Sequence, residues 1–188
     1  MGDDEAAVRA TALDAALLEL QQWGVDRFSI EGVAHRSQLD AALIRGCWQD
    51  PRELIIDALV TSTSTTIRMP DTGSLAGDLT ELAASVGVYL NDPVGRRIAR
   101  MLVIDSKSHT VDDETRQLFW YRHLEVVDAI VARATERGEF RTEVRPITVL
   151  QLLTAPLQTS ALYSSGPVEP GYCRAIADLV TRAVSTST

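Results

Sequence analysis

Residues 28–54 read FSIEGVAHRSQLDAALIRGCWQDPREL and contain the clearest local signals of the chain. Ser29 is a good N-cap for a short helix, because its hydroxyl can accept from a free N–H of the first turn. Residues 37–39 predict a tight turn, after which Asp40 can cap a third helix. Residues 50–53 predict a capping box with proline at the first helical position. Two short helices, a tight turn and a capped following helix predict a helix-turn-helix head with a connecting helix.

Helical periodicity extends on both sides of this segment. Leu13, Ala16, Leu17 and Leu20 form one apolar stripe of a first helix over about residues 4–23, which Gly24 ends. No alternating strand pattern and no Asn-Gly or Asp-Gly hairpin turn is present. We therefore expect an all-α fold of about nine helices, with a three-helix head (residues 1–50) joined by a connecting helix to a C-terminal helical bundle (residues 51–188). Further helices are predicted over residues 51–65, 74–90, 93–106, 112–137, 146–164 and 169–184.

Composition sets limits on this interpretation. Hydrophobic residues make up 45% of the chain, which is the ordinary globular range, and two distant cysteines are too few for a disulfide framework or a zinc site. The acidic N-terminus has no signal-peptide pattern, and no segment approaches the length of a membrane span, so we expect a cytoplasmic protein.

The charge balance argues against nucleic-acid binding. The formal net charge is −8, and residues 1–60 hold five arginines against eleven acids, so the predicted head is the more acidic part of the chain. DNA-binding domains are usually basic. Acids on the far side of the head would nevertheless be screened from DNA beyond about 8 Å at physiological salt.

The third predicted helix has one apolar side and one outward side. Leu39, Ile44 and Trp48 are expected to be buried, with Trp48 a core residue rather than a stacking platform. On the outward side, small alanines would let the backbone approach bases closely, and Arg45 could donate to a phosphate or to a guanine edge. An ordinary exposed arginine on a helix is the alternative for Arg45, and the surrounding pattern favours the contact. The outward side consists of Ala41, Ala42, Arg45 and Gln49.

The segments Phe28-Ser29-Ile30, Val33-Ala34 and Ser37 through Trp48 resemble, in register and without a gap, the head of tetracycline-repressor (TetR) family regulators. Ser29 falls where the family has a Thr or Ser that contacts phosphate, and Trp48 takes the place of a buried Phe. The chain departs from the family at three positions, where Gln38 replaces a turn glycine, Arg45 replaces a phosphate-contacting Tyr, and Pro51 replaces a Lys with the same role. The predicted DNA-binding residues are Ser29, Arg36, Gln38, Asp40, Ala41, Ala42, Arg45, Gln49 and Arg52.

The C-terminal part carries two further predictions. Residues 118–123 concentrate three of the ten aromatic residues, so a pocket for an apolar or planar effector is one interpretation, and ordinary core is the other. The last two predicted helices have apolar faces which, by the family resemblance, would form a four-helix bundle with a second copy. The predicted pocket residues are Tyr89, Met101, Asp105, Trp120, Tyr121 and His123.

The function expected from these features is a ligand-responsive transcriptional regulator, a repressor by expectation, that binds double-stranded operator DNA as a homodimer. The alternative is a dimeric ligand-binding or protein-interaction module of the same fold whose head does not bind DNA. The three histidines are scattered, and no metal-binding, nucleophile or phosphate-loop motif is present. We therefore expect no enzyme activity, no cofactor and no metal.

Overall fold

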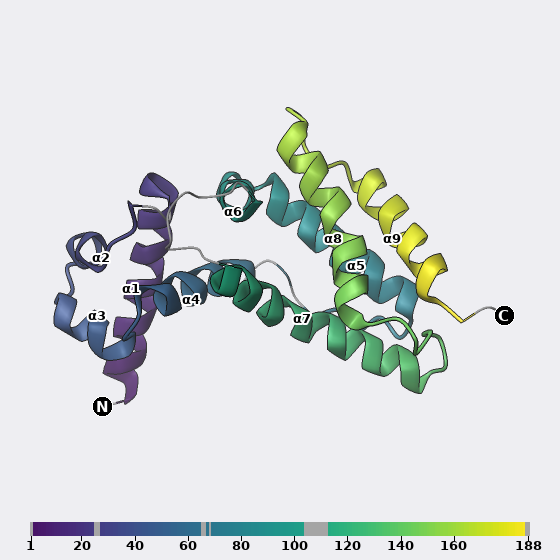
Figure 1. The fold of residues 1–188 in the computed structure, drawn as a ribbon, viewed down its shortest axis with the longest axis horizontal. Coiled ribbons are helices and arrows are strands. Elements are labelled where there is room, and N and C mark those ends of the chain that lie inside the picture. The colour runs from purple at the N-terminus through teal and green to yellow at the C-terminus, as the bar shows by residue number, and fades with distance from the viewer. Residues whose placement is uncertain (1, 25–26, 65–66, 68, 104–112, 187–188) are drawn as a thin grey trace. The chain divides into compact units, whose positions relative to one another are not determined.

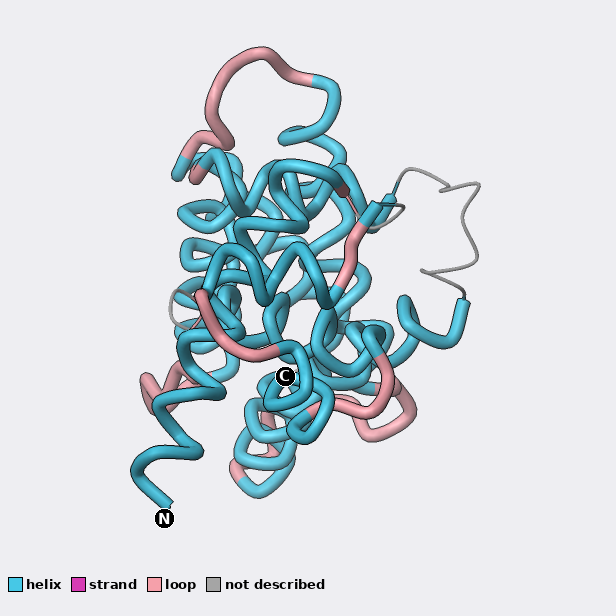
Figure 2. The backbone as a smooth tube through the Cα atoms, turned by 90° about the vertical axis from the view of Figure 1, so that its left-hand side faces the viewer, coloured by secondary structure: helices cyan, strands magenta, loops and turns pink. Residues whose placement is uncertain are grey.

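The computed structural model describes residues 2–24, 27–64, 67, 69–103 and 113–186. In these residues the backbone forms helices and connecting loops without a strand, and a single isolated antiparallel bridge joins Phe140 and Ser185 (Figures 1 and 2). The all-α prediction is confirmed. The helices are α1 (Gly2–Trp23), α2 (Ile30–Ser37), α3 (Ala41–Cys47), α4 (Pro51–Ser64), α5 (Leu75–Asn91), α6 (Pro93–Val103), α7 (Asp113–Glu136), α8 (Pro146–Tyr163) and α9 (Pro170–Val184).

The chain divides into two compact units. The first consists of Met1–Ser62 with Arg100–Trp120, and the second of Thr63–Ala99 with Tyr121–Thr188. Most of α4 therefore belongs to the compact unit that holds α1 to α3, although the sequence prediction began the second domain at residue 51. In the described part of the chain, no helix is both long and apolar enough to cross a membrane.

The core of the first unit explains why these short helices are stable. Short helices are marginal by themselves, so their stability comes from the apolar faces that they bury. Both α2 and α3 pack on α1, and α2 also packs on α3. Gly24 has a φ of 71° and ends α1 as predicted. The buried side chains of this unit include Ala12, Ala16, Leu20, Ile30, Val33, Ile44, Trp48, Leu54, Ile55, Ala58 and Leu59.

In the second unit, α5 packs against both α8 and α9, which also pack on each other. Gly87 lies where α5 meets α9, and a Cβ at this position would come within 2.6 Å of the Cys173 sulfur. Glycine at this position therefore permits the close approach of the two helices. Burial raises the pKa of the Cys173 thiol, which makes it a core residue with little thiolate character.

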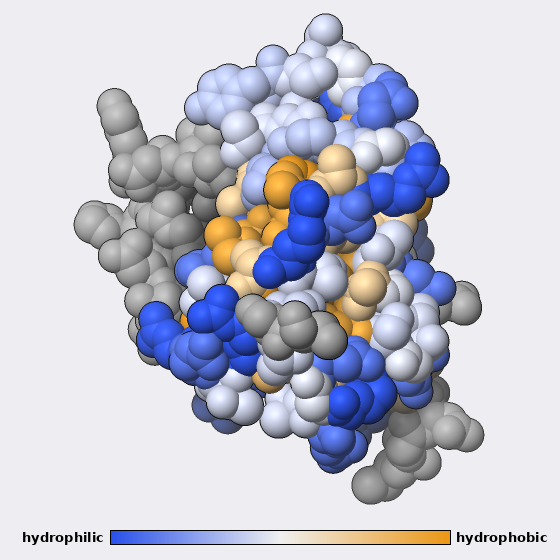
Figure 3. Space-filling view, turned by 90° about the vertical axis from the view of Figure 1, so that its right-hand side faces the viewer, coloured by the Kyte–Doolittle hydropathy of each residue, from blue (hydrophilic) through white to orange (hydrophobic). Residues whose placement is uncertain are grey.

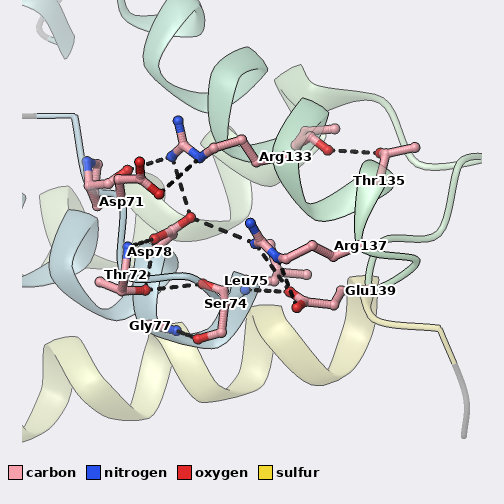
Figure 4. Close-up of polar contacts among 12 residues, drawn as sticks. Asp71, Thr72, Ser74, Leu75, Gly77, Asp78, Arg133, Thr135, Arg137 and Glu139 are labelled. Carbon is pink, nitrogen blue, oxygen red and sulfur yellow. Dashed lines mark hydrogen bonds and ion pairs between the residues drawn. The ribbon is translucent and has the colours of Figure 1, made fainter.

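A polar network attaches the first turn of α5 to the C-terminal end of α7 (Figure 4). The side chain of Asp78 is 0% exposed and accepts hydrogen bonds from the backbone N–H and the hydroxyl of Thr72, at 2.7 and 2.8 Å. Arg133 Nη2 lies 3.4 Å from the same carboxylate, and Arg137 Nη2 lies 4.0 Å from it. Glu139 accepts from the backbone N–H of Leu75 at 2.6 Å.

The ionisation of Asp78 follows from these contacts. Burial by itself raises the pKa of this carboxyl, but the hydrogen bonds from Thr72 and Arg133 and the charge of Arg133 outweigh burial. The pKa of Asp78 therefore lies below its ordinary value of 3.8, and the buried group is a paired carboxylate at neutral pH.

Candidate nucleic-acid interface

The helix-turn-helix is built by the local caps that the sequence predicted. Ser29 Oγ accepts a hydrogen bond from the backbone N–H of Gly32 at 3.0 Å, and Asp40 Oδ1 accepts from that of Ala42 at 2.8 Å. Gln38 takes the left-handed conformation between α2 and α3, with φ of 58°. This conformation explains why glycine is the usual residue at the turn, since a side chain in this region is strained.

The side chains of α3 divide into an anchored side and an outward side. Ile44 is 0% and Trp48 2% exposed, as predicted, whereas Leu39 is only half-buried. Ala42, Arg45 and Gln49 are exposed, and Ala41 is half-buried.

Leu43 is a candidate contact that sequence reasoning missed. Its side chain is 53% exposed on the same helix as Arg45, although a leucine in a helical pattern is usually assigned to the core. Its position next to the buried Ile44 was the available signal, because adjacent helical residues do not face the same way. An exposed apolar side chain on this helix can contact a thymine methyl group.

A cluster around Asp57 holds the end of α3 against α4 and α1. The indole N–H of Trp48 donates to Asp57 Oδ2 at 2.9 Å, and Arg9 Nη2 lies 3.3 Å from the same oxygen. The Arg9 guanidinium also stacks over the Trp48 ring, 4.4 Å from its centroid. The orientation of α3 is therefore set by a polar contact with α4 as well as by apolar packing.

Arg36 has a structural role in the head. Its Nε lies 2.6 Å from Glu19 Oε2, its Nη2 donates to Gln22, and Glu19 is 4% exposed. A Cβ on Gly32 would fall 2.0 Å from the Glu19 carboxylate, so glycine makes room for this pair. The predicted DNA contact of Arg36 stays a prediction, because its Nε and Nη2 already donate to Glu19 and Gln22.

Arg45 and Arg52 form ion pairs on the surface. Arg45 Nη2 donates to the Glu31 carboxylate, with side chains 51% and 69% exposed, and Arg52 Nε lies 3.0 Å from Asp50. Asp50 also caps α4, but it accepts from the backbone N–H of Arg52 at 2.9 Å rather than from that of Glu53. The predicted capping box is therefore wrong in detail, although the N-cap and the helix start are confirmed.

Most of the predicted effector pocket lies outside the described side chains. Met101, Asp105, Trp120 and His123 are among those that the structure does not describe. Tyr89 is buried in the second unit, and Tyr121 is 61% exposed. The pocket remains a prediction.

The outer face of α8 and α9 carries apolar side chains that the chain does not bury. Leu152 is 45% and Leu179 56% exposed, whereas their neighbours Leu153 and Val180 are buried. An open groove of about 750 Å³ runs along this face. Figure 3 shows hydrophobic surface near the centre of one face, interrupted and surrounded by hydrophilic residues. The groove is lined by Gln151, Leu152, Ala155, Pro156, Thr159, Ser160, Tyr163, Ser164 and Tyr172.

Two short helices joined by a tight turn, the second anchored on one side and exposed on the other, are typical of helix-turn-helix transcriptional regulators. Residues 69–180 match the family model described as tetracyclin repressor-like, C-terminal domain. The chain is 31% identical to the HTH-type transcriptional regulator AqdR of Rhodococcus erythropolis, over 71% of this chain and 64% of AqdR, which is less than two thirds of that relative. It belongs to the TetR family of transcriptional regulators, so the resemblance seen in the sequence is confirmed.

Two further comparisons cover nearly the whole chain. It is 23% identical to the uncharacterized HTH-type transcriptional regulator YdeS of Bacillus subtilis, over 96% of this chain and 89% of YdeS. The crystal structure of the TetR family transcription regulator SCO0332 has the same fold, with a TM-score of 0.72 and 22% identity over 94% of this chain and 98% of that one.

Proposed function

We propose that this chain binds operator DNA as a homodimer and represses transcription until a small-molecule effector binds to its C-terminal domain. The observation that carries the proposal is the outward side of α3, where Ala42, Leu43 and Arg45 are exposed while Ile44 and Trp48 anchor the helix, and Gln49, just after the helix, is also exposed. This division is what a recognition helix needs in order to enter the major groove.

The proposed contacts separate into those that position the protein and those that read bases. The Ser29 hydroxyl oxygen accepts a hydrogen bond from the backbone N–H of Gly32. Its hydrogen can rotate about the Cβ–Oγ bond and donate to a phosphate. Arg45 can donate to a guanine edge, and Leu43 can contact a thymine methyl. Gln38, Asp40, Ala41 and Arg52 remain in the proposed interface as residues of the turn and the helix ends.

The open face of α8 and α9 supports the dimer. Contiguous exposed apolar surface can mark an interaction site, and a second copy offers the same surface about a two-fold axis. A two-fold dimer also supplies the spacing of roughly 34–36 Å that two recognition helices need on successive turns of DNA.

Effector control requires a difference in affinity between two conformations. The ligand must bind more tightly to the conformation that binds DNA less well, and the coupling is reciprocal. We propose a pocket that includes Tyr89 and Tyr121, with Met101, Asp105, Trp120 and His123 as further candidates, for an apolar or planar compound. We also propose a cytoplasmic location, because a regulator of this kind must reach chromosomal DNA.

Fluorescence anisotropy tests the DNA-binding part of the proposal. Duplexes from the DNA that flanks the gene of this protein would be titrated with the full chain across a range of salt. We expect specific binding that weakens as salt rises and that falls about fivefold or more for Arg45→Ala, because a bidentate base contact contributes about 1–3 kcal/mol. Binding that is equal for flanking and random duplexes would reject the proposal.

A second function, a dimeric interaction or ligand-binding module without DNA binding, is favoured by the charges of the head. Residues 1–60 have eleven acids, and the arginines Arg36, Arg45 and Arg52 are each paired with one. Light scattering that finds a folded dimer, together with no DNA binding even at low salt, would favour this module.

A further inference from the structure

All five arginines of residues 1–60 have partners within the chain. Arg9 pairs with Asp57, Arg27 stacks over Trp23, and the other three pair with Glu19, Glu31 and Asp50. The pair of Arg45 with Glu31 differs from the rest, because it joins the recognition helix α3 to the first turn of α2 on the outward side. Its two side chains, 51% and 69% exposed, are also the most exposed of these ion pairs.

The position of Glu31 explains why an acid is tolerated there. Glu31 lies in the first turn of α2, where the helix dipole favours a negative charge. A carboxylate at this place nevertheless lies beside the arginine that the proposed function directs at DNA. Phosphates approaching Arg45 would therefore meet a negative charge that holds the same guanidinium.

The geometry leaves Arg45 able to bind a second acceptor. The contact with Glu31 is made by Nη2, and a guanidinium has five N–H donors in a planar fork. The remaining donors can serve the O6 and N7 acceptors of a guanine edge. These acceptors carry only partial negative charges, so Glu31 repels them less than it repels a phosphate, which carries a full charge.

We propose that Glu31 is a specificity-determining residue, whose carboxylate holds the Arg45 guanidinium and disfavours phosphate contacts relative to contacts with a guanine edge. The proposal rests on the proposed DNA-binding function and deepens it. The negative charge of Glu31 would then lower the affinity of the head for DNA of arbitrary sequence. Surface ion pairs are weak, so Arg45 is not prevented from contacting DNA.

The test compares Glu31→Gln with the wild-type full chain on two probes. The first is the duplex that the wild-type protein selects from a randomised pool, and the second is a random-sequence duplex of equal length. For the random duplex we expect the slope of log affinity against log salt to steepen by about 0.9, which is one more phosphate contact, with affinity about five- to tenfold higher at low salt. For the selected duplex we expect a change below about twofold, so the ratio of specific to non-specific affinity falls.

Two control variants separate the pair from the net charge. Glu53→Gln makes the same charge change at another exposed acid, in the first turn of α4, and should leave the slope unchanged. Adding Glu31→Gln to Arg45→Ala should also leave the slope of Arg45→Ala unchanged, because the effect acts through Arg45.

Each other result overturns a specific statement. If Glu31→Gln and Glu53→Gln change both probes equally, the effect is one of net charge and the role of Glu31 is rejected. If Glu31→Gln still steepens the slope when Arg45 is alanine, Glu31 does not act through Arg45. If the wild-type protein enriches no sequence from the pool, the proposed function fails, and the role of Glu31 fails with it.

Discussion

Gln38 stands where the family has a glycine in the turn of the helix-turn-helix. It occupies the turn between α2 and α3 with a φ of 58°, a conformation that costs a non-glycine residue about 1–2 kcal/mol. Ser37 helps to hold the turn, because its hydroxyl accepts from the backbone N–H of Leu39 at 3.3 Å. The turn therefore forms in spite of its central residue, through the caps and the core on either side.

Gln38→Gly should stabilise the protein. Relief of the strained conformation is offset in part by the greater freedom of glycine in the unfolded chain, so we expect a gain of about 0.5–1 kcal/mol. Urea denaturation followed by circular dichroism would measure it. Gln38→Ala is the control, because alanine keeps the strain, and a gain as large with alanine would show that strain is not the cause.

At the scale of elements, two carboxylates connect helices that the apolar pattern alone would leave free to rotate. Asp57 of α4 binds the side chains of Trp48 and Arg9, and Asp78 of α5 binds those of Arg133 and Thr72. Apolar packing is non-directional, whereas a hydrogen bond to a buried indole or a guanidinium specifies an orientation. Each carboxylate lies within one compact unit, so each acts on the geometry of that unit.

Asp57→Ala should loosen the attachment of the recognition helix. The indole N–H of the buried Trp48 would lose its acceptor, at a cost of about 1–3 kcal/mol in the free energy of unfolding. Asp57→Asn keeps an acceptor oxygen but loses the charge that faces Arg9, so its loss should be smaller. The indole N–H resonance of Trp48 in NMR spectra would report on the contact directly. An unchanged resonance in the alanine variant would contradict the assignment of this hydrogen bond.

The Asp78 network should make stability depend on pH in the acid range. Because the folded state has the lower pKa, the unfolded state takes up the proton first as pH falls. The contribution of the carboxylate is then complete above the ordinary value of 3.8 and is lost as pH falls through the lower value of the folded state. We expect the difference in unfolding free energy between wild type and Asp78→Asn, about 1–3 kcal/mol at pH 7, to be constant from about pH 5 to 8 and to shrink below about pH 4.

Measuring that difference, rather than the wild type alone, removes most of the contribution of other acids. Glu139 requires this care, because hydrogen bonds from Arg137 and from the backbone of Leu75 also lower its pKa. A difference that stayed constant down to pH 3 would show that the charge of Asp78 does not stabilise the fold.

At the scale of the whole molecule, the outer face of α8 and α9 is an exposed apolar face in the described part of the chain. Both helices bury one side against α5 and leave Leu152 and Leu179 exposed on the other. The family resemblance assigns this second side to a partner copy. The dimer and the two-fold spacing of the heads would then have a common structural origin.

Leu179→Asp should convert the protein to a monomer and abolish specific DNA binding, because a charge would be buried without a partner in the proposed interface. Light scattering coupled to size exclusion would measure the mass. Val88→Asp is a matched control, since Val88 is 62% exposed but lies on α5, outside the face formed by α8 and α9. A dimer that survived the Leu179 substitution would place the interface elsewhere.

Local sequence was enough to predict the helices, most of their caps and the turn, because each of these depends on residues within a few positions of one another, and the resemblance of the head indicated the class of protein. The start of α8 at Pro146 and the end of α1 at Gly24 follow from the backbone conformations that proline and glycine prefer. These preferences do not depend on which residues pack nearby. The same reasoning missed Leu43 as an outward residue. It also could not divide the apolar faces of α8 and α9 into buried and exposed sides.

Contacts between distant segments could not be predicted from the sequence and became known only from the tertiary structure. The pairs Glu19 with Arg36, Glu31 with Arg45, and Asp78 with Arg133 join residues on different helices, and no periodic pattern specifies which acid a given arginine meets. Periodicity determines which side of a helix is apolar, while the packing of one helix on another determines which charges come within reach. That packing pairs the arginine of the recognition helix with an acid of the helix before it.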